Sequence, residues 1–83
     1  MKSLPHTKRK RTFRRMRRRM SDLGLRLIDI ELATGLSKSS VGERMAGRQS
    51  WRIEEAYCVL DLLNEPVSTL PEYFPINIFE EVI

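Results

Sequence analysis

The stretch GLSKSSVGERMAG, residues 35–47, decides the fold, because it predicts a tight turn followed by a short helix. Gly35 is suited to end a preceding helix, since glycine adopts the left-handed backbone conformation at low cost. Ser37 is a good N-cap for the next helix, because its hydroxyl accepts hydrogen bonds from free N–H groups of the first turn. Val41 and Met45 lie four residues apart, so we expect them to face the core together.

Hydrophobic periodicity extends the helical pattern on both sides of this stretch. One apolar stripe of a helix over residues 8–23 is formed by Phe13, Met16, Met20 and Leu23. A later helix has an apolar face made of Ile53, Ala56, Tyr57, Leu60 and Leu63. The predicted helices and a final helical turn are residues 8–23, 27–34, 38–46, 53–63 and 68–74. Because no segment alternates like a strand, the expected fold class is an all-α, compact bundle of four to five short helices.

Length and composition favour one small domain without a prosthetic group. The chain has 83 residues, of which 41 % are hydrophobic and 31 % charged, as in a folded soluble domain. Its one cysteine, Cys58, excludes an internal disulfide, and neither Cys58 nor His6 has partners at metal-ligand spacing. No apolar run approaches the roughly 20 residues of a membrane span, and none follows the basic N-terminus as in a signal peptide. We expect no metal, cofactor, membrane or small-molecule ligand, and no catalytic arrangement of serine, histidine and carboxylate.

Charge is distributed very unevenly along the chain. Residues 1–26 hold eleven Lys/Arg and one Asp, a net charge of +10, whereas residues 27–83 hold four Lys/Arg and ten Asp/Glu, a net charge of −6. This asymmetry predicts an anionic partner for the first third of the chain. Nucleic acid is the first candidate and a membrane surface the second.

The segment LRLIDIELATGLSKSSVGERMAG, with SWRIEEAYCVLDLLN and LPEYF after it, resembles the lambda-repressor-like (Cro/C1-type, Xre) helix-turn-helix family of small phage and bacterial regulators. The resemblance covers residues 17–74 and is most specific in and around the turn, at Gly35, Leu36, Ser37, Val41 and Gly47. It implies a DNA-binding domain over residues 8–75, preceded by a flexible arm, residues 1–7, and followed by a short apolar tail, residues 76–83.

In such a family the helix after the turn lies in the major groove of double-stranded DNA. The matching positions here are Ser37, Lys38, Ser39, Gly42, Glu43 and Ala46, while Ser40 and Arg48 are candidates for backbone contacts. Lys38 and Ser39 are expected to bond base edges or phosphates, whereas Glu43 would accept from cytosine N4. For each residue alone, the alternative is a solvated surface side chain.

The helix before the turn departs from the family pattern. Leu27 stands where the family usually has a polar residue, and Glu31 where it has a small one. Arg44 stands at a position that is commonly apolar in the family. We therefore state the hypothesis that a Glu31–Arg44 ion pair replaces the small-residue contact. The alternative is that Glu31 extends to solvent.

The basic N-terminal helix is expected to attract phosphates, so that binding weakens with salt. Arg9, Lys10 and Arg11 are candidates for an arm that reaches a groove or follows the backbone. The predicted phosphate-binding residues are Arg9, Lys10, Arg11, Arg14, Arg15, Arg17, Arg18 and Arg48. Arginine-rich helices also bind structured RNA, which leaves an RNA-binding protein as an alternative.

The resemblance implies a cytoplasmic, nucleoid-associated transcriptional regulator, a repressor before an activator, that binds an operator as a homodimer. A further alternative is a protein-interaction module such as an antirepressor or an antitoxin. The apolar tail residues form a dimer patch or fold back onto the core: Ile76, Ile78, Phe79, Val82 and Ile83. The aromatic residues Trp51, Tyr57, Tyr73 and Phe74 are expected in the core rather than as platforms for stacked bases. Cys58 is expected to be partly buried.

Overall fold

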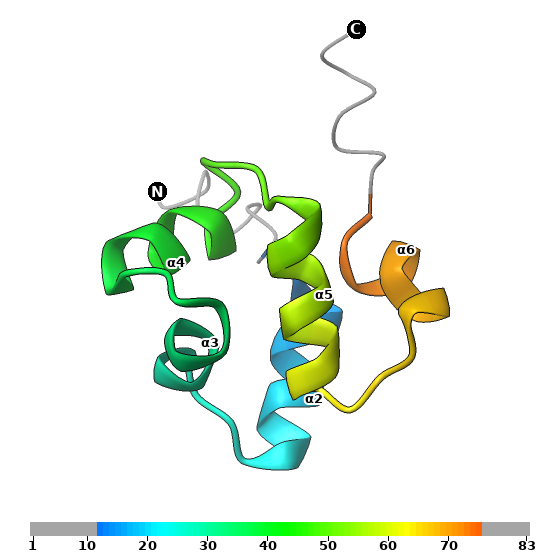
Figure 1. Ribbon diagram of the computed structural model, residues 1–83. Coiled ribbons are helices and arrows are strands. Elements are labelled where there is room, and N and C mark those ends of the chain that lie inside the picture. Colours follow the sequence, from blue (N-terminus) through cyan, green and yellow to red (C-terminus); the bar gives the residue numbers. More distant parts are fainter. Residues whose placement is uncertain (1–11, 76–83) are drawn as a thin grey trace, which may run out of the picture.

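The computed structural model describes residues 12–75, which form helices joined by short loops and contain no strand (Figure 1). The elements are α2 (Arg14–Leu23), α3 (Leu27–Thr34), α4 (Lys38–Met45), α5 (Ile53–Leu62), the 3-10 turn η1 (Val67–Thr69) and α6 (Leu70–Tyr73). The predicted all-α bundle is therefore confirmed. The bounds of α3 are those predicted, and α4 and α5 each end one residue earlier.

The start of the first helix differs from its prediction. Residues 12 and 13 form a turn, and α2 begins at Arg14. Phe13 adopts a left-handed conformation with φ 54°, which interrupts any helix running into α2 from the N-terminal side. The rest of the predicted helix, residues 8–11, lies outside the described residues, as do the arm 1–7, His6 and the tail 76–83.

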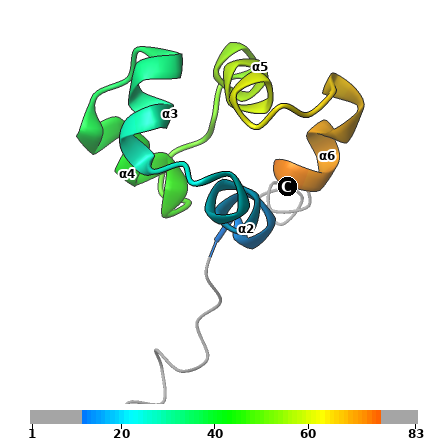
Figure 2. The same cartoon turned by 90° about the horizontal axis from the view of Figure 1, so that it is seen from below.

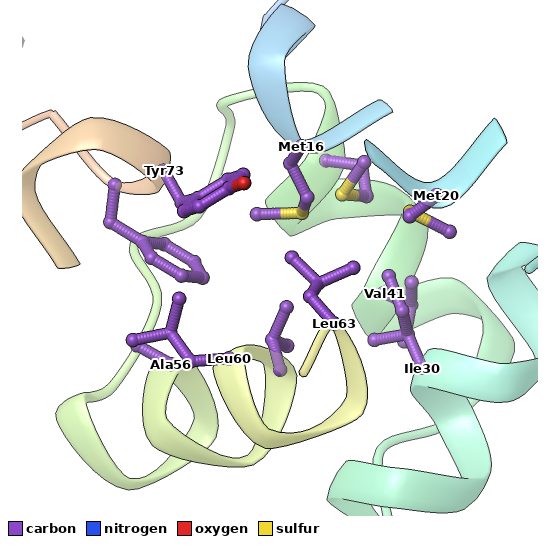
Figure 3. Packing of buried hydrophobic residues seen from close by; sticks show 11 residues of the cluster. Met16, Met20, Ile30, Val41, Ala56, Leu60, Leu63 and Tyr73 are labelled. Carbon is purple, nitrogen blue, oxygen red and sulfur yellow. The ribbon is translucent and has the colours of Figure 1, made fainter. Parts of the chain in front are cut away.

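The helices surround one core. Seen along its axis, α2 lies across from α5, with α3 and α4 on one side and α6 on the other (Figure 2). Met16 and Met20 of α2 point toward Leu60 and Leu63 of the α5 region (Figure 3). The other buried apolar residues come from every remaining α-helix or its end and are Ile30, Val41, Met45, Ala56, Val59, Tyr73 and Phe74. Local helices with short connections thus bury a single apolar centre.

Four residues are exposed although the sequence predicted otherwise. Leu23, Ile53 and Tyr57 were predicted for apolar faces, and Cys58 was expected to be partly buried. Leu23, Ile53 and Tyr57 keep 41 %, 51 % and 45 % of their surface in contact with solvent, and Cys58 is exposed too. In α5 the buried positions Ala56, Val59 and Leu60 mark the inner side. Each residue turns the helix by about 100°, so Tyr57 lies at the edge of that side and Cys58 on the far side. The predictions for Tyr57 and Cys58 were therefore wrong, because periodicity does not give the width of the buried stripe.

An aromatic cluster joins the two ends of the described chain. The ring centroids of Trp51 and Phe74 are 5.4 Å apart, and Phe13 lies 6.1 Å from each of them. The rings of Phe13 and Trp51, and of Trp51 and Phe74, meet edge to face, a favoured aromatic geometry. The cluster therefore ties the start of α2 and the end of α6 to the loop before α5. Trp51, Tyr73 and Phe74 lie in or against the core, as predicted.

Candidate nucleic-acid interface

The turn between α3 and α4 has the conformation that its sequence predicts. Gly35 has φ 81°, in the left-handed region, and its N–H donates to the Glu31 carbonyl at 2.8 Å. The Thr34 hydroxyl donates to the Ile30 carbonyl and accepts from the Leu36 N–H, so the side chain of Thr34 closes the same corner. Leu36 packs against the core. These bonds fix the direction in which the chain leaves α3 and starts α4.

Ser37 is the N-cap of α4, as predicted. Its Oγ accepts from the Ser40 N–H at 3.1 Å, and its carbonyl accepts from the Val41 N–H at 3.0 Å. The hydroxyls of Ser37 and Ser40 also lie 3.1 Å apart. Both side chains are therefore held in the first turn of α4, so any contact that they make with a ligand competes with the cap.

The sides of α4 are clearly different. Val41, Arg44 and Met45 are buried, so they mark the side of α4 that faces the rest of the protein. Lys38, Ser39 and Ala46 are exposed, while Ser40, Gly42 and Glu43 are half-buried. We call the set Ser37, Lys38, Ser39, Gly42, Glu43 and Ala46 the α4 outer face. Its members are accessible from solvent at least in part, and Lys38 and Ser39 are among the exposed ones.

Arg44 is the one charged residue among the buried residues of the described chain, and its partner is Glu55. Its Nε and Nη2 donate to the two carboxylate oxygens of Glu55 at 2.8 and 3.3 Å. Its Nη1 donates to the Ser40 carbonyl at 3.3 Å and to Gln49 Oε1 at 3.1 Å. Glu55 Oε1 also accepts from the Arg52 N–H at 2.9 Å, which holds this carboxylate at the start of α5. The bonds to Glu55 and Gln49 therefore fix α4 against α5 and the loop between them, while the bond to the Ser40 carbonyl stays within α4.

The hypothesis of a Glu31–Arg44 ion pair is wrong. The Arg44 guanidinium is occupied by Glu55, and no ion pair of Glu31 occurs within residues 12–75. The physical reason is that Glu55 is positioned in advance by the first turn of α5, so Arg44 meets a fixed bidentate acceptor. The half-buried Glu31 instead lines a hollow with Arg26 and Lys38.

Glu43 and Arg48, both predicted to meet DNA, bind one another. Arg48 Nε and Nη2 donate to the two Glu43 carboxylate oxygens at 3.0 and 3.2 Å, and the Arg48 N–H donates to the Glu43 carbonyl at 2.9 Å. The hydrogen bonds from Arg48 hold the pKa of Glu43 below its ordinary value, and Glu43 raises the pKa of Arg48. Because the pair is exposed, it can open at small cost for either partner to meet a ligand.

Some arginines of α2 form ion pairs with other described residues, and others have no such partner within residues 12–75. Arg15 pairs with Glu72 at 2.9 Å and lies over the Tyr73 ring, and Arg19 pairs with Glu65 at 3.2 Å. These contacts join α2 to the C-terminal part of the described chain. Arg14 and Arg18 are exposed and have no ion pair or hydrogen bond within residues 12–75. They lie four residues apart, so they share one face of α2.

The start of α2 is attached to the end of α4. The Thr12 hydroxyl donates to the Met45 carbonyl, and Arg17 Nη2 donates to the same oxygen at 3.2 Å. A cation at this position is favourable, because the free carbonyls at a helix C-terminus carry partial negative charge. Gly47 follows with φ 83°, and a Cβ there would lie 3.3 Å from Thr12 Cγ2. The basic N-terminal segment therefore joins the fold beside the last turn of α4.

Three apolar residues of α3 are exposed, and two of them lie on its outer side. Ile28 and Leu32 are 45 % and 77 % exposed, and Leu27 is 40 % exposed. Ile28 and Leu32 lie four residues apart, on the side of α3 opposite the buried Ile30. We call these residues, Leu27, Ile28 and Leu32, the α3 strip.

Sequence reasoning missed Glu55, Gln49, Arg19 and the α3 strip. The signal for Glu55 was present in part, because an acidic residue three positions after a helix start is a capping pattern. Its second role, as the partner of Arg44, has no sequence signal.

Of the predicted phosphate-binding residues, Arg9, Lys10 and Arg11 lie outside the described residues. So does the predicted dimer patch of the tail.

Comparisons with protein-family models, with curated proteins and with solved structures found no match to this chain. No group of three or more His, Cys, Asp or Glu in residues 12–75 is arranged to hold a metal ion. None of the helices in that part of the chain is long and apolar enough to cross a membrane.

Proposed function

We propose that this protein binds double-stranded DNA in a sequence-specific manner, as a small helix-turn-helix transcriptional regulator that acts mainly as a repressor. The α4 outer face reads base edges in the major groove, while Arg14, Arg18 and the basic N-terminal segment contact phosphates. One observation supports this most. The N-cap end and outer face of α4 are accessible, and the basic segment joins the fold at the other end of the same helix, through Thr12 and Met45.

The buried contacts of α4 support the same proposal. A helix that reads base edges must keep its orientation, because hydrogen bonds to bases have narrow geometry. The Gly35 turn fixes the start of α4, and the Arg44–Glu55 pair fixes its middle against α5. The accessible side chains Lys38 and Ser39 are thus carried on a rigid element.

The test is selection of bound duplexes from a random pool, carried out with the full chain at two salt concentrations. We expect an enriched consensus, and a palindromic one if the protein binds as a homodimer. The double variant Lys38→Ala/Ser39→Ala should lose about tenfold to a hundredfold in discrimination between the consensus and random duplex. Ser68→Ala, an exposed serine far along the chain, is the matched control and should keep the discrimination. No enriched consensus would contradict the proposal.

Two alternatives rest on specific observations. Arg14 and Arg18, which have no ion pair within residues 12–75 and share one face of α2, favour binding of structured RNA. Competition by RNA hairpins at equal ionic strength would reveal such binding. The α3 strip favours a protein-interaction module, because it gathers three exposed apolar side chains on one short helix, and exposed apolar patches mark protein-interaction sites. Leu32→Ser should then abolish partner binding and leave DNA binding unchanged.

A further inference from the structure

A cavity of about 240 Å³ lies between the start of α2, the loop before α5 and α6. Its walls are mostly apolar and include three aromatic rings; the apolar lining residues include Phe13, Trp51, Ala56, Leu70 and Phe74. An apolar cavity of about 150 Å³ is large enough to take a benzene ring. This cavity is therefore of a size to receive one aromatic side chain, and it is smaller than the roughly 300–1,000 Å³ of ordinary small-molecule sites.

The described chain ends at this cavity. Pro75 is its last described residue and also one of the residues that line the cavity. The sequence continues as Ile76, Asn77, Ile78, Phe79, Glu80 and Glu81. Four extended residues span at most about 14 Å, so the ring of Phe79 is within reach of the cavity from Pro75 in the same chain.

The charge at the rim agrees with the sequence that follows Phe79. Arg48 and Arg52 both line the cavity, and the Arg52 guanidinium has no ion-pair partner within residues 12–75. Glu80 and Glu81 directly follow Phe79, so a buried Phe79 ring would bring two carboxylates to the rim. Opposite charges at the rim of a binding site mainly fix how the bound segment is oriented and which segment is accepted.

Trp51, which lines this cavity, also carries a buried hydrogen-bond donor. The Trp51 indole Nε1 is buried and has no hydrogen-bond partner among the described residues. A buried N–H without a partner costs about 1–3 kcal/mol.

We propose that the C-terminal segment 76–81 of the same chain docks on this cavity, with the Phe79 ring among Phe13, Trp51 and Phe74 and with Glu80 or Glu81 facing Arg52. The segment then closes the aromatic cluster that joins both ends of the fold. Docking within one chain is favoured over exchange between two chains, because the short connection from Pro75 gives a high effective concentration. The proposal does not depend on DNA binding.

The direct test is nuclear Overhauser spectroscopy on the full chain. We expect cross-peaks between the Phe79 ring and the Trp51 indole in uniformly labelled protein. A mixture of labelled and unlabelled chains should show no such cross-peak between chains. Cross-peaks between chains would overturn the proposal in favour of a second copy as the occupant, and their complete absence would overturn docking altogether.

A second measurement uses the fact that Trp51 is the one tryptophan of the chain. Phe79→Ala should shift the tryptophan emission to longer wavelength and raise its quenching by acrylamide. Val82→Ala, an equally apolar tail position beyond the two glutamates, is the matched control and should change neither. Arg52→Gln should raise quenching less than Phe79→Ala. Equal behaviour of Phe79→Ala and Val82→Ala would contradict the assigned anchor.

Discussion

Arg44 of α4 and Glu55 of α5 form a bidentate ion pair inside the protein, with Nε–Oε1 and Nη2–Oε2 distances of 2.8 and 3.3 Å. Their side chains are only 11 % and 12 % exposed. The same carboxylate accepts from the N–H that precedes α5, and the same guanidinium reaches Gln49 in the loop. This pair therefore sets how α4, the helix that we propose to read DNA, is oriented on the rest of the fold.

Removing one partner of this pair should be costly. Arg44→Met and Glu55→Gln are each expected to lower the free energy of unfolding by about 3 kcal/mol or more, because each leaves a buried polar or charged group without its partner. The double variant should lose less than the sum of the two single losses. Urea unfolding followed by circular dichroism measures all three, and strictly additive losses would show that the two residues are not coupled.

The glycines on either side of Ser37 should respond to alanine with opposite signs. Gly35→Ala places a side chain at φ 81°, which should cost about 1–2 kcal/mol even though no atom lies within 4 Å of the new Cβ. Gly42→Ala lies inside α4, also in open space, and should stabilise by about 0.5–1 kcal/mol. Thermal unfolding without DNA compares the two variants. A loss of stability at Gly42 would contradict the described course of α4.

The salt dependence of DNA binding should report Arg14 and Arg18, the two arginines of α2 that have no ion pair within residues 12–75. Arg14→Gln/Arg18→Gln should weaken binding to all duplexes alike and reduce the slope of log K against log salt by up to about 1.8. Arg19→Gln is the control, because Arg19 is already paired with Glu65 and should change the slope less. An unchanged slope in the double variant would remove α2 from the proposed interface.

The titration of Glu43 should depend on Arg48. Since the pKa of Glu43 is lowered in the folded protein, the pair contributes stability above the ordinary carboxyl pKa and loses it as the pH falls through the lowered value. Arg48→Gln should return the pKa of Glu43 toward its ordinary value. Carbon-detected NMR titration of the Glu43 carboxyl measures this, and the same pKa in both proteins would contradict the pair.

The same pair should restrain DNA binding if the proposed interface is correct. Glu43→Gln frees Arg48 and removes one negative charge from the α4 outer face, so affinity for duplex DNA should rise at low salt. Asp61→Asn, on an exposed position of α5, makes the same change in net charge elsewhere and is the matched control. If both variants raise affinity equally, only net charge matters and the Glu43–Arg48 pair has no local role.

Features that depend on neighbours along the chain were predictable from sequence. The Gly35 turn, the Ser37 cap and the burial of Val41 and Met45 follow from backbone preferences and from helical spacing. The widths of the buried stripes were not predictable in this way. Tyr57 and Ile53 are exposed because α5 is covered on one side by its neighbours only as far as Ala56 and Leu60.

The sequence by itself determined the number and order of the described helices, the corner between α3 and α4, and the concentration of positive charge near the N-terminus. These are local properties, because caps, turns and periodicity act over a few residues. Only the tertiary structure decided that Arg44 pairs with Glu55 rather than Glu31, which arginines of α2 have partners within residues 12–75, and that Thr12 meets Met45. Each of these contacts joins different parts of the chain, so it exists only after packing has brought them together.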